Sequence, residues 1–304
     1  MQEPTTSQTD IQPVTQELQD WIVAQAKAGC GPKAMLASML TSGWQEAVAV
    51  RALEQTLVEH GLGSLGSLAT PAVEMPQQAT SSVLDTLVVP EPLDCKSTHT
   101  LSLPDREVQV LSQMFDPRVV VLGGMLSHAE CDEMVELAST RLSRSKTVLV
   151  QTGGSEVNEA RTSDGMFFDR EENPLCARIE ARIAAMLKWP LHNGEGLQVL
   201  RYLPGAQYKP HYDYFDPIHP GTPKILTRGG QRVATLVMYL NTPARGGATT
   251  FPDARMEVAP VKGNAVFFSY DRPDPSTKTL HGGAPVIEGE KWVATKWLRE
   301  GRFD

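Results

Sequence analysis

The chain has 304 residues, of which 41% are hydrophobic, so it can bury a core and hold one domain of about 200 residues beside a smaller one. Its formal net charge of -8 argues against a nucleic-acid backbone or an anionic membrane as the main partner, because both attract basic surfaces. The four cysteines form no CxxC pair, which argues against zinc and disulfide frameworks and favours free thiols in the cytoplasm.

The first 62 residues are expected to hold a disordered start and a small helical module. Residues 1–14 contain no Lys or Arg and no apolar run, so they do not resemble a secretory signal. Across residues 15–62, apolar residues recur at helical spacing: Leu18, Trp21 and Ile22 on one face, then Val50, Leu53 and Leu57. A module of this size can barely form a core alone. It is therefore expected to serve homodimerisation or the binding of another protein.

Residues 63–103 carry Gly, Ser, Thr and Pro without periodicity, which predicts a linker before a larger domain over residues 104–304. The larger domain contains the run VVVLGGML, which predicts a buried strand. Ser127 follows it, with Glu130 three residues later, and this spacing predicts a capping box at the start of a helix. A second helix is expected from Pro174.

After Leu191 the helical periodicity gives way to short apolar runs separated by Gly and Pro. These runs are LQVLRYL, QYKPHYDYF, RVATLVMYLN, ATTF, MEV, NAVFFSY, LHGGAPV and KWVATKWL. Strands of this length and spacing indicate an antiparallel sandwich or barrel, with the two helices outside it.

Two residues in the second run, His211 and Asp213, are candidate metal ligands. Residues two apart in a strand point to one face, so an imidazole and a carboxylate can reach a single ion. The pair alone is weak, because a His-x-Asp occurs by chance in roughly one chain in three of this composition. His128 and Glu130 have similar spacing, but at a helix start, where such residues do not face each other.

A third candidate, His281, lies late in the series of strands, where a sandwich can return it to the first pair. Two His and one carboxylate leave open positions on an octahedral ion, which suits Fe(II) chemistry with oxygen, whereas zinc with similar ligands favours hydrolysis. Lys291 follows in the alternating strand GEKWVATKWL. A buried Lys requires an anion and a solvent-facing Lys does not, and the spacing leaves both orientations open.

The region from about Val119 to Arg299 resembles the prolyl 4-hydroxylase branch of the Fe(II)- and 2-oxoglutarate-dependent dioxygenases. The resemblance runs in order through LSHAECDEMVELA, ARTSDGMFF, LQVLRYLPGAQYKPHYDYF, RVATLVMYLNTPARGGATTFP, KGNAVFFSY and LHGGAPVIEGEKWVATKWL. Together these motifs cover about two thirds of the chain, and the ensemble is specific to this family.

The resemblance implies an α+β fold, with a double-stranded β-helix (jelly-roll) core and buttressing helices beside the small all-α module. It implies that His211, Asp213 and His281 are the iron ligands and that Lys291 pairs with the distal carboxylate of 2-oxoglutarate. The residues that it places around the cosubstrate are Tyr202, Tyr239 and Trp297. The implied cofactors are Fe(II), 2-oxoglutarate and O2, with L-ascorbate (vitamin C) as a further candidate.

Arg161 and Tyr212 are candidates for the substrate cleft, because residues 145–165 are polar, contain glycine and are expected to lie over the site. The implied activity is that of a procollagen-proline 4-dioxygenase-like enzyme, which hydroxylates a C–H bond of a prolyl residue in a peptide or protein and releases succinate and CO2.

Three alternatives remain open. The helical module does not match the peptide-binding domain of collagen-type relatives, so an oxygenase that acts on a free amino acid or another small molecule fits as well. A zinc hydrolase on the same barrel is the second alternative. The third is a non-catalytic protein-binding module with a vestigial barrel, against which the intact ligand set and Lys291 argue.

Overall fold

The computed structural model describes residues 14–27, 30–41, 44, 46–60, 87–92, 97–145, 147–149, 154–156 and 161–304. The chain divides into two compact units, Met1–Thr80 and Ser81–Asp304. The predicted disordered start lies outside the described residues except for Val14, as does most of the predicted linker. No helix in the described ranges has the length and apolar character needed to cross a bilayer.

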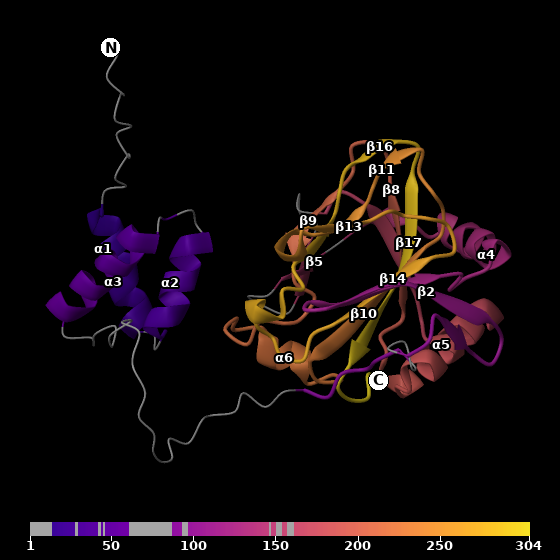
Figure 1. Cartoon of the computed structure of the whole chain (residues 1–304), viewed down its shortest axis with the longest axis horizontal. Coiled ribbons are helices and arrows are strands. Elements are labelled where there is room, and N and C mark those ends of the chain that lie inside the picture. The colour runs from indigo at the N-terminus through magenta and orange to yellow at the C-terminus, as the bar shows by residue number, and fades with distance from the viewer. Residues whose placement is uncertain are drawn as a thin grey trace, which may run out of the picture. The chain divides into compact units, whose positions relative to one another are not determined.

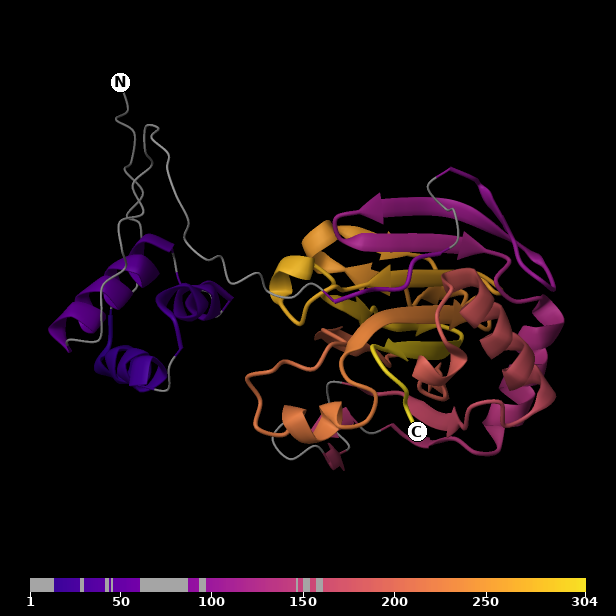
Figure 2. The ribbon, with the colours of Figure 1, turned by 90° about the horizontal axis from the view of Figure 1, so that it is seen from below.

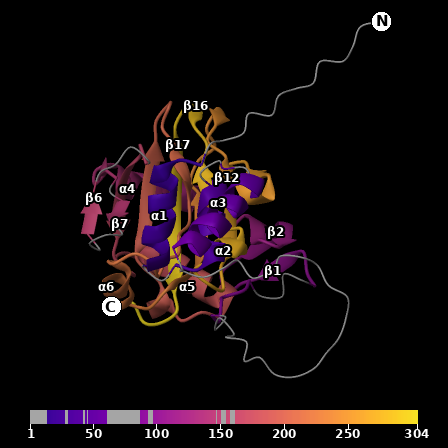
Figure 3. The same ribbon diagram turned by 90° about the vertical axis from the view of Figure 1, so that its left-hand side faces the viewer.

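The described residues of the N-terminal unit form three helices, drawn in indigo in Figures 1 and 3: α1 (Gln16–Lys27), α2 (Pro32–Thr41) and α3 (Glu46–Glu59). Leu18 and Ile22 of α1 belong to one buried cluster with Leu53 and Leu57 of α3, as their helical spacing predicted. Pro32 is the first residue of α2, where its missing N–H removes no helical hydrogen bond. The role of this unit in dimerisation or protein binding stays a prediction.

The C-terminal unit is built on a nine-stranded sheet, in the order β1-β2-β3-β14-β10-β17-β8-β7-β4, and a four-stranded sheet, in the order β13-β12-β15-β9 (Figures 1 and 2). The strands of the larger sheet are β1 (Thr100–Ser102), β2 (Glu107–Phe115), β3 (Arg118–Gly123), β4 (Ser143–Arg144), β7 (Asp164–Phe168), β8 (Leu197–Tyr202), β10 (Arg232–Tyr239), β14 (Ala265–Ser269) and β17 (Lys291–Arg299). Those of the smaller sheet are β9 (Tyr208–His211), β12 (Thr249–Phe251), β13 (Met256–Val258) and β15 (His281–Gly283). Two further pairs are β5 (Thr147–Leu149) with β6 (Gly154–Glu156), and β11 (Arg245–Gly246) with β16 (Val286–Glu288).

From β8 onward the chain passes back and forth between the two main sheets. It runs from β8 in the larger sheet to β9 in the smaller, returns to β10, crosses to β12 and β13, returns to β14, crosses to β15 and ends on β17. All of these strands pair antiparallel with their neighbours. This alternation is the double-stranded β-helix, or jelly roll, that was expected.

The helices of this unit are α4 (His128–Ser139), α5 (Pro174–Leu187) and α6 (Thr222–Leu226), with short 3-10 turns at Leu191–Asn193, Pro252–Ala254 and Pro275–Thr277. The predicted capping box of α4 is confirmed, because the Glu130 backbone N–H donates to Ser127 Oγ at 3.1 Å and the Ser127 N–H donates to the Glu130 carboxylate at 2.8 Å. The start of α5 is confirmed at Pro174, where Asn173 Oδ1 accepts from the Cys176 N–H at 2.9 Å.

Both faces of the larger sheet are covered, so its central strands are buried throughout. On β14, Ala265 and Phe267 belong to the cluster that includes residues of α4 and α5, whereas Val266 and Phe268 belong to the cluster that includes residues of the smaller sheet. Figure 1 shows α4 and α5 on one side of this sheet and β9 and β13 on the other. The space between the two sheets is therefore separated from α4 and α5 by the larger sheet.

The C-terminal unit begins before residue 104, where its predicted domain starts. β1 pairs antiparallel with β2, so the sheet starts inside the segment 63–103 that was predicted to be a linker. Farther upstream, the Leu87 N–H donates to the Asp271 carbonyl at 2.7 Å, and Leu87 and Val89 pack against the core. Tertiary pairing explains the difference, because the short TLS strand has no periodicity that marks it in the sequence.

Candidate active site

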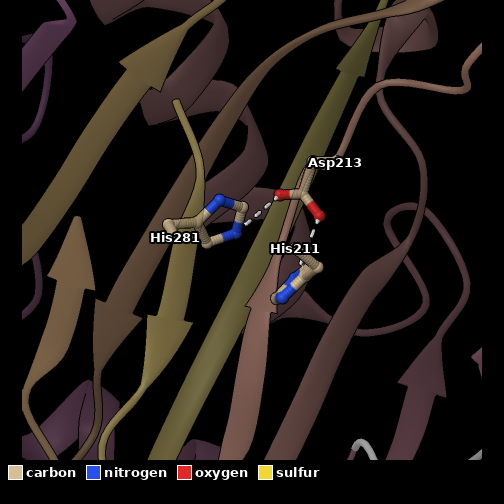
Figure 4. Close-up of side chains that lie close together, drawn as sticks. All are labelled: His211, Asp213 and His281. Atoms are coloured by element: carbon tan, nitrogen blue, oxygen red, sulfur yellow. Dashed lines mark ion pairs between the residues drawn. The ribbon is translucent and has the colours of Figure 1, made fainter. Parts of the chain in front are cut away.

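His211, Asp213 and His281 come together between the two sheets (Figure 4). His211 ends β9 and His281 begins β15, and the two residues are direct partners in the antiparallel register. Asp213 lies just beyond the end of β9, not within a continuous strand as the sequence suggested. One ligand atom from each residue lies within 4.8 Å of the others, a spacing that a single ion can bridge. The structure thus gathers the three predicted ligands.

The two imidazoles are held so that their Nε2 atoms converge. His211 Nδ1 lies 2.9 Å from the Lys209 carbonyl, and His281 Nδ1 lies 2.9 Å from the Thr279 carbonyl. A carbonyl only accepts, so each Nδ1 carries the proton and each Nε2 presents a lone pair. His211 Nε2 is 3.6 Å and His281 Nε2 is 3.4 Å from the Asp213 carboxylate. This is the tautomer that a metal requires of both rings.

The Asp213 carboxylate is buried, at 6% exposure, and is oriented by a hydrogen-bonded pair on the larger sheet. Thr235 Oγ1 donates to Asp213 Oδ2 at 2.7 Å, and Tyr270 Oη lies 3.0 Å from the same Thr235 oxygen. Thr235 donates its single hydroxyl proton to Asp213, so in the second hydrogen bond the Tyr270 hydroxyl must be the donor and Thr235 Oγ1 the acceptor. Burial opposes ionisation of Asp213, but the positive charge and the hydrogen bonds that His281 and His211 offer when protonated hold its pKa well below the usual value. The site therefore holds an anionic ligand between two imidazoles.

Lys291 begins β17 and projects into the same cavity, where its side chain is 4% exposed. Its Nζ lies over the rings of Tyr202 and Tyr239, at 5.6 and 5.7 Å from their centroids. No carboxylate of the described residues forms an ion pair with it, and burial lowers its pKa to about 8. A buried ammonium without a described carboxylate partner indicates a site for an anion.

The three predicted cosubstrate aromatics lie around Lys291 and the cavity wall. Tyr202 lines the cavity and pairs with Lys291 in the β8–β17 register. Trp297 lines it as well, with the Arg232 guanidinium 4.0 Å from its ring centroid. Tyr239 is not among the described residues that line the cavity; it lies beneath Lys291 and donates its hydroxyl to Thr249 Oγ1 at 2.8 Å.

The two candidates for the substrate cleft have different positions. Arg161 is buried in the cavity wall, 5.2 Å from the centroid of the Tyr208 ring, and donates to Gln198 Oε1 at 3.3 Å. Tyr212 is not among the described residues that line this cavity, and its place in a substrate cleft stays a prediction. Its neighbours in sequence face the metal position, so its own side chain turns away and stacks on Tyr214 at 4.9 Å.

The polar groups that support the ligands from other parts of the chain were not predicted from the sequence. Thr235 is one, and a second is a buried cluster in which Glu195 pairs with Arg232 at 2.7 Å and with Arg299 at 2.8 Å. Arg232 also lies 3.5 Å from the Asp213 carbonyl oxygen. One feature of the sequence could have indicated Thr235: it is a polar residue inside the apolar strand RVATLVMY. A buried polar side chain needs a hydrogen-bond partner, which here is Asp213.

The competing pair, His128 and Glu130, does not form a second site. Besides the cap, Glu130 pairs with Arg106 at 2.8 Å and with Arg182 at 2.6 Å. Burial raises the pKa of Glu130, but Arg182, the Ser127 backbone N–H and Arg178 lower it to about 2. Across the described ranges, the only group of His, Cys, Asp or Glu residues spaced to hold a metal is the one at His211, Asp213 and His281.

Comparison with known proteins agrees with this geometry. The 2OG-Fe(II) oxygenase superfamily matches residues 197–299. "Probable prolyl 4-hydroxylase 4" of Arabidopsis thaliana is 40% identical over 225 residues, which cover 66% of this chain and 72% of that protein. "Prolyl 4-hydroxylase 1" of the same plant is 41% identical over 224 residues, or 67% of this chain and 76% of the relative.

Among solved structures, a viral collagen prolyl hydroxylase from Paramecium Bursaria Chlorella virus-1, in complex with 2-oxoglutarate, is similar at 31% identity and a TM-score of 0.46. That comparison covers 60% of this chain and 95% of the viral one. The identity to the plant proteins extends over most of their length, and the superfamily match over residues 197–299 includes His211, Asp213 and His281. The chain belongs to the prolyl 4-hydroxylase branch of the 2-oxoglutarate- and Fe(II)-dependent oxygenases.

Proposed function

We propose that this protein hydroxylates a C–H bond of a prolyl residue in a peptide or protein, and that His211, Asp213 and His281 hold its iron. The family makes it a 2-oxoglutarate-dependent dioxygenase that uses Fe(II), 2-oxoglutarate and O2. The observation that carries the assignment of the site is the single cavity that holds both the three convergent donors and the Lys291 ammonium.

The donor set fits Fe(II). Two neutral imidazoles and one carboxylate would hold Fe(II) and leave room on it for 2-oxoglutarate and O2. Bound there, Fe(II) supplies the oxidising chemistry by which one atom of O2 enters the substrate C–H bond and the other enters succinate as CO2 is lost. The protein holds the three ligands rigidly, and Thr235 and the two backbone carbonyls orient them.

Lys291 supports the cosubstrate assignment. A dicarboxylate bound to the metal through one end would place its other carboxylate elsewhere in the cavity, where Lys291 is a buried cation that forms no ion pair with a described carboxylate. The hydroxyl of Tyr202 lies on the same wall, and burial raises the pKa of Tyr202 to about 12, so it stays a hydrogen-bond donor. Together they would neutralise and orient the distal carboxylate.

A prolyl substrate is supported by the plant relatives, which are named prolyl 4-hydroxylases. The test is succinate production with Fe(II), 2-oxoglutarate and O2, against a panel of proline-containing peptides and a panel of free amino acids, with His281→Ala as the blank. We expect proline-containing peptides to raise succinate above the blank. If they do no better than the blank while a free amino acid does, the prolyl-peptide assignment is wrong and the enzyme acts on a small molecule.

Two other assignments stay predictions. We propose a cytoplasmic location, supported by free thiols at Cys30, Cys131 and Cys176. We also propose that L-ascorbate sustains turnover, which rests on the family alone and is tested by succinate yield with and without it.

A further inference from the structure

Tyr270 is a buried tyrosine beside the metal site, and the proposed reaction gives its hydroxyl no role. It directly follows β14, is 2% exposed and belongs to the cluster that includes residues of the smaller sheet. Burial, and then the nearby Asp213 carboxylate, raise the pKa of Tyr270 well above the usual value. A buried phenol usually finds a hydrogen-bond partner, and the partner of Tyr270 is Thr235, which itself donates to Asp213. The hydroxyl is therefore one hydrogen bond away from a metal ligand.

The two hydrogen bonds run in one direction, from Tyr270 through Thr235 to Asp213. Tyr270 donates to Thr235 Oγ1 across 3.0 Å, and Thr235 donates to Asp213 Oδ2 across 2.7 Å. In such a chain each hydrogen bond polarises the next, so the Tyr270 hydroxyl strengthens the one that Thr235 makes to the carboxylate. A carboxylate oxygen that accepts a short hydrogen bond has less electron density to offer a metal. The other oxygen, Oδ1, is thereby left for the ion.

Aromatic packing fixes the position of the Tyr270 ring. Its centroid lies 6.1 Å from that of Tyr214, the residue after Asp213, with an angle of 61° between the ring planes. It also lies 6.3 Å from the centroid of Phe268, whose ring packs against the His281 imidazole at 4.5 Å. Aromatic pairs with these separations and tilts stabilise the packing. The hydroxyl of Tyr270 is therefore held at a fixed place relative to two of the three ligands.

We propose that Tyr270 is a positioning residue of the metal site, which acts through Thr235 to keep Asp213 Oδ2 hydrogen-bonded and Oδ1 available to the ion. The inference rests on the proposed function, because it requires that Asp213 is a metal ligand. Tyr270 is not among the described residues that line the cavity, so it acts through Thr235 and not by contact with the substrate. A tyrosine that only filled the core would leave metal affinity unchanged when its hydroxyl is removed. A positioning tyrosine lowers that affinity, and does so only while Thr235 is present.

The test measures Fe(II) binding to the metal-free, full-length chain, without O2 or 2-oxoglutarate, in Tyr270→Phe, in Thr235→Val and in the double variant. Tyr270→Phe keeps the ring and removes the hydroxyl. It should weaken Fe(II) binding by about three- to tenfold, less than the loss of the Thr235 donor, because it lies one hydrogen bond farther from the ligand. Added to Thr235→Val, it should change the affinity by less than about twofold, because the two groups act in series.

The visible absorption of Co(II), bound in place of Fe(II), gives a second readout, because its bands report how the ligands are arranged around the ion. Tyr270→Phe should shift these bands in the same direction as Thr235→Val. If Tyr270→Phe fails to fold, Tyr270→4-fluorophenylalanine fills the same space without a donor.

Tyr239→Phe is the matched control. Tyr239 is also a fully buried tyrosine that donates to a threonine, Thr249, at 2.8 Å, but within the described part of the chain this pair hydrogen-bonds to none of the three ligands. Because Tyr239 lies beneath Lys291, the comparison is made on metal binding without 2-oxoglutarate. Tyr239→Phe should leave the Fe(II) affinity within about twofold and the Co(II) bands in place.

The outcomes separate the two claims. An unchanged Fe(II) affinity in the folded Tyr270 variant, an equal loss with and without Thr235, or an equal loss in Tyr239→Phe overturns the positioning role and leaves the metal site standing. If the unmodified protein binds Fe(II) no more tightly than His281→Ala does, the proposed metal site fails, and the role of Tyr270 fails with it.

Discussion

Replacing Lys291 with Met should stabilise the protein in the absence of cosubstrate and weaken its binding of 2-oxoglutarate. Burial lowers the pKa of Lys291 from 10.5 to about 8, so the folded state disfavours the ammonium by about 3 kcal/mol at neutral pH. Met keeps the apolar stem and removes this penalty. For a domain of this size the melting temperature should rise by up to roughly 6–12 °C. The same change removes a charge-assisted contact, which should weaken 2-oxoglutarate binding by roughly ten- to hundredfold.

The assay pairs thermal unfolding of the metal-free protein with calorimetric titration of 2-oxoglutarate into the iron-loaded protein without O2. Lys296→Met is the matched control, because Lys296 lies on the same strand and pairs with Glu180. Removing one partner of that buried pair should destabilise the fold by about 3–5 kcal/mol and leave cosubstrate affinity within about twofold. A Lys291→Met protein that melts lower than the unmodified one and binds 2-oxoglutarate equally well would refute the reasoning.

Three further predictions follow from the site. The affinity for 2-oxoglutarate should fall as pH rises above about 8, by up to tenfold per unit, because deprotonation of Lys291 removes the charge that the carboxylate needs; a flat profile in calorimetric titration from pH 7 to 9.5 would contradict this. Thr235→Val should lower Fe(II) affinity by about 10- to 100-fold in anaerobic titration, whereas Thr235→Ser, which keeps the hydroxyl donor to Asp213, should stay near the unmodified value. Gly196→Ala should lower the free energy of unfolding in urea by about 1–3 kcal/mol, since its Cβ meets the Phe168 carbonyl; equal stability would show that the backbone yields there at no cost.

The parts of the site that the sequence predicted are those set by local periodicity or by the family motifs. His211 and Asp213 are two residues apart, so extended backbone alone puts them on one side. The meeting with His281 depends on the pairing of β9 with β15, which the family resemblance implied and periodicity could not. The spacing of Lys291 did not decide whether its side chain points inward. Both faces of the larger sheet are covered, and the odd-numbered residues of β17, such as Lys291 and Trp297, face the cavity.

The parts that the sequence did not predict depend on contacts between distant strands. Thr235 reaches Asp213 from β10, and Glu195 reaches Arg232 across 37 residues, and neither pair has a local signature. Tyr212 differs from these residues, because a local pattern sets the direction of its side chain. It is adjacent to two ligands in sequence. Side chains alternate between the two faces of extended backbone, so the Tyr212 side chain points away from the metal position.

The central claim is that His211, Asp213 and His281 hold Fe(II) in a cavity that also binds 2-oxoglutarate through Lys291. The most direct measurement is anaerobic titration with Fe(II) and 2-oxoglutarate, followed by visible absorption. A charge-transfer band should appear only when both are present, should be lost in His281→Ala, and should require much more 2-oxoglutarate in Lys291→Met. No band in the unmodified protein, together with hydrolytic activity supported by zinc without 2-oxoglutarate, would contradict the account.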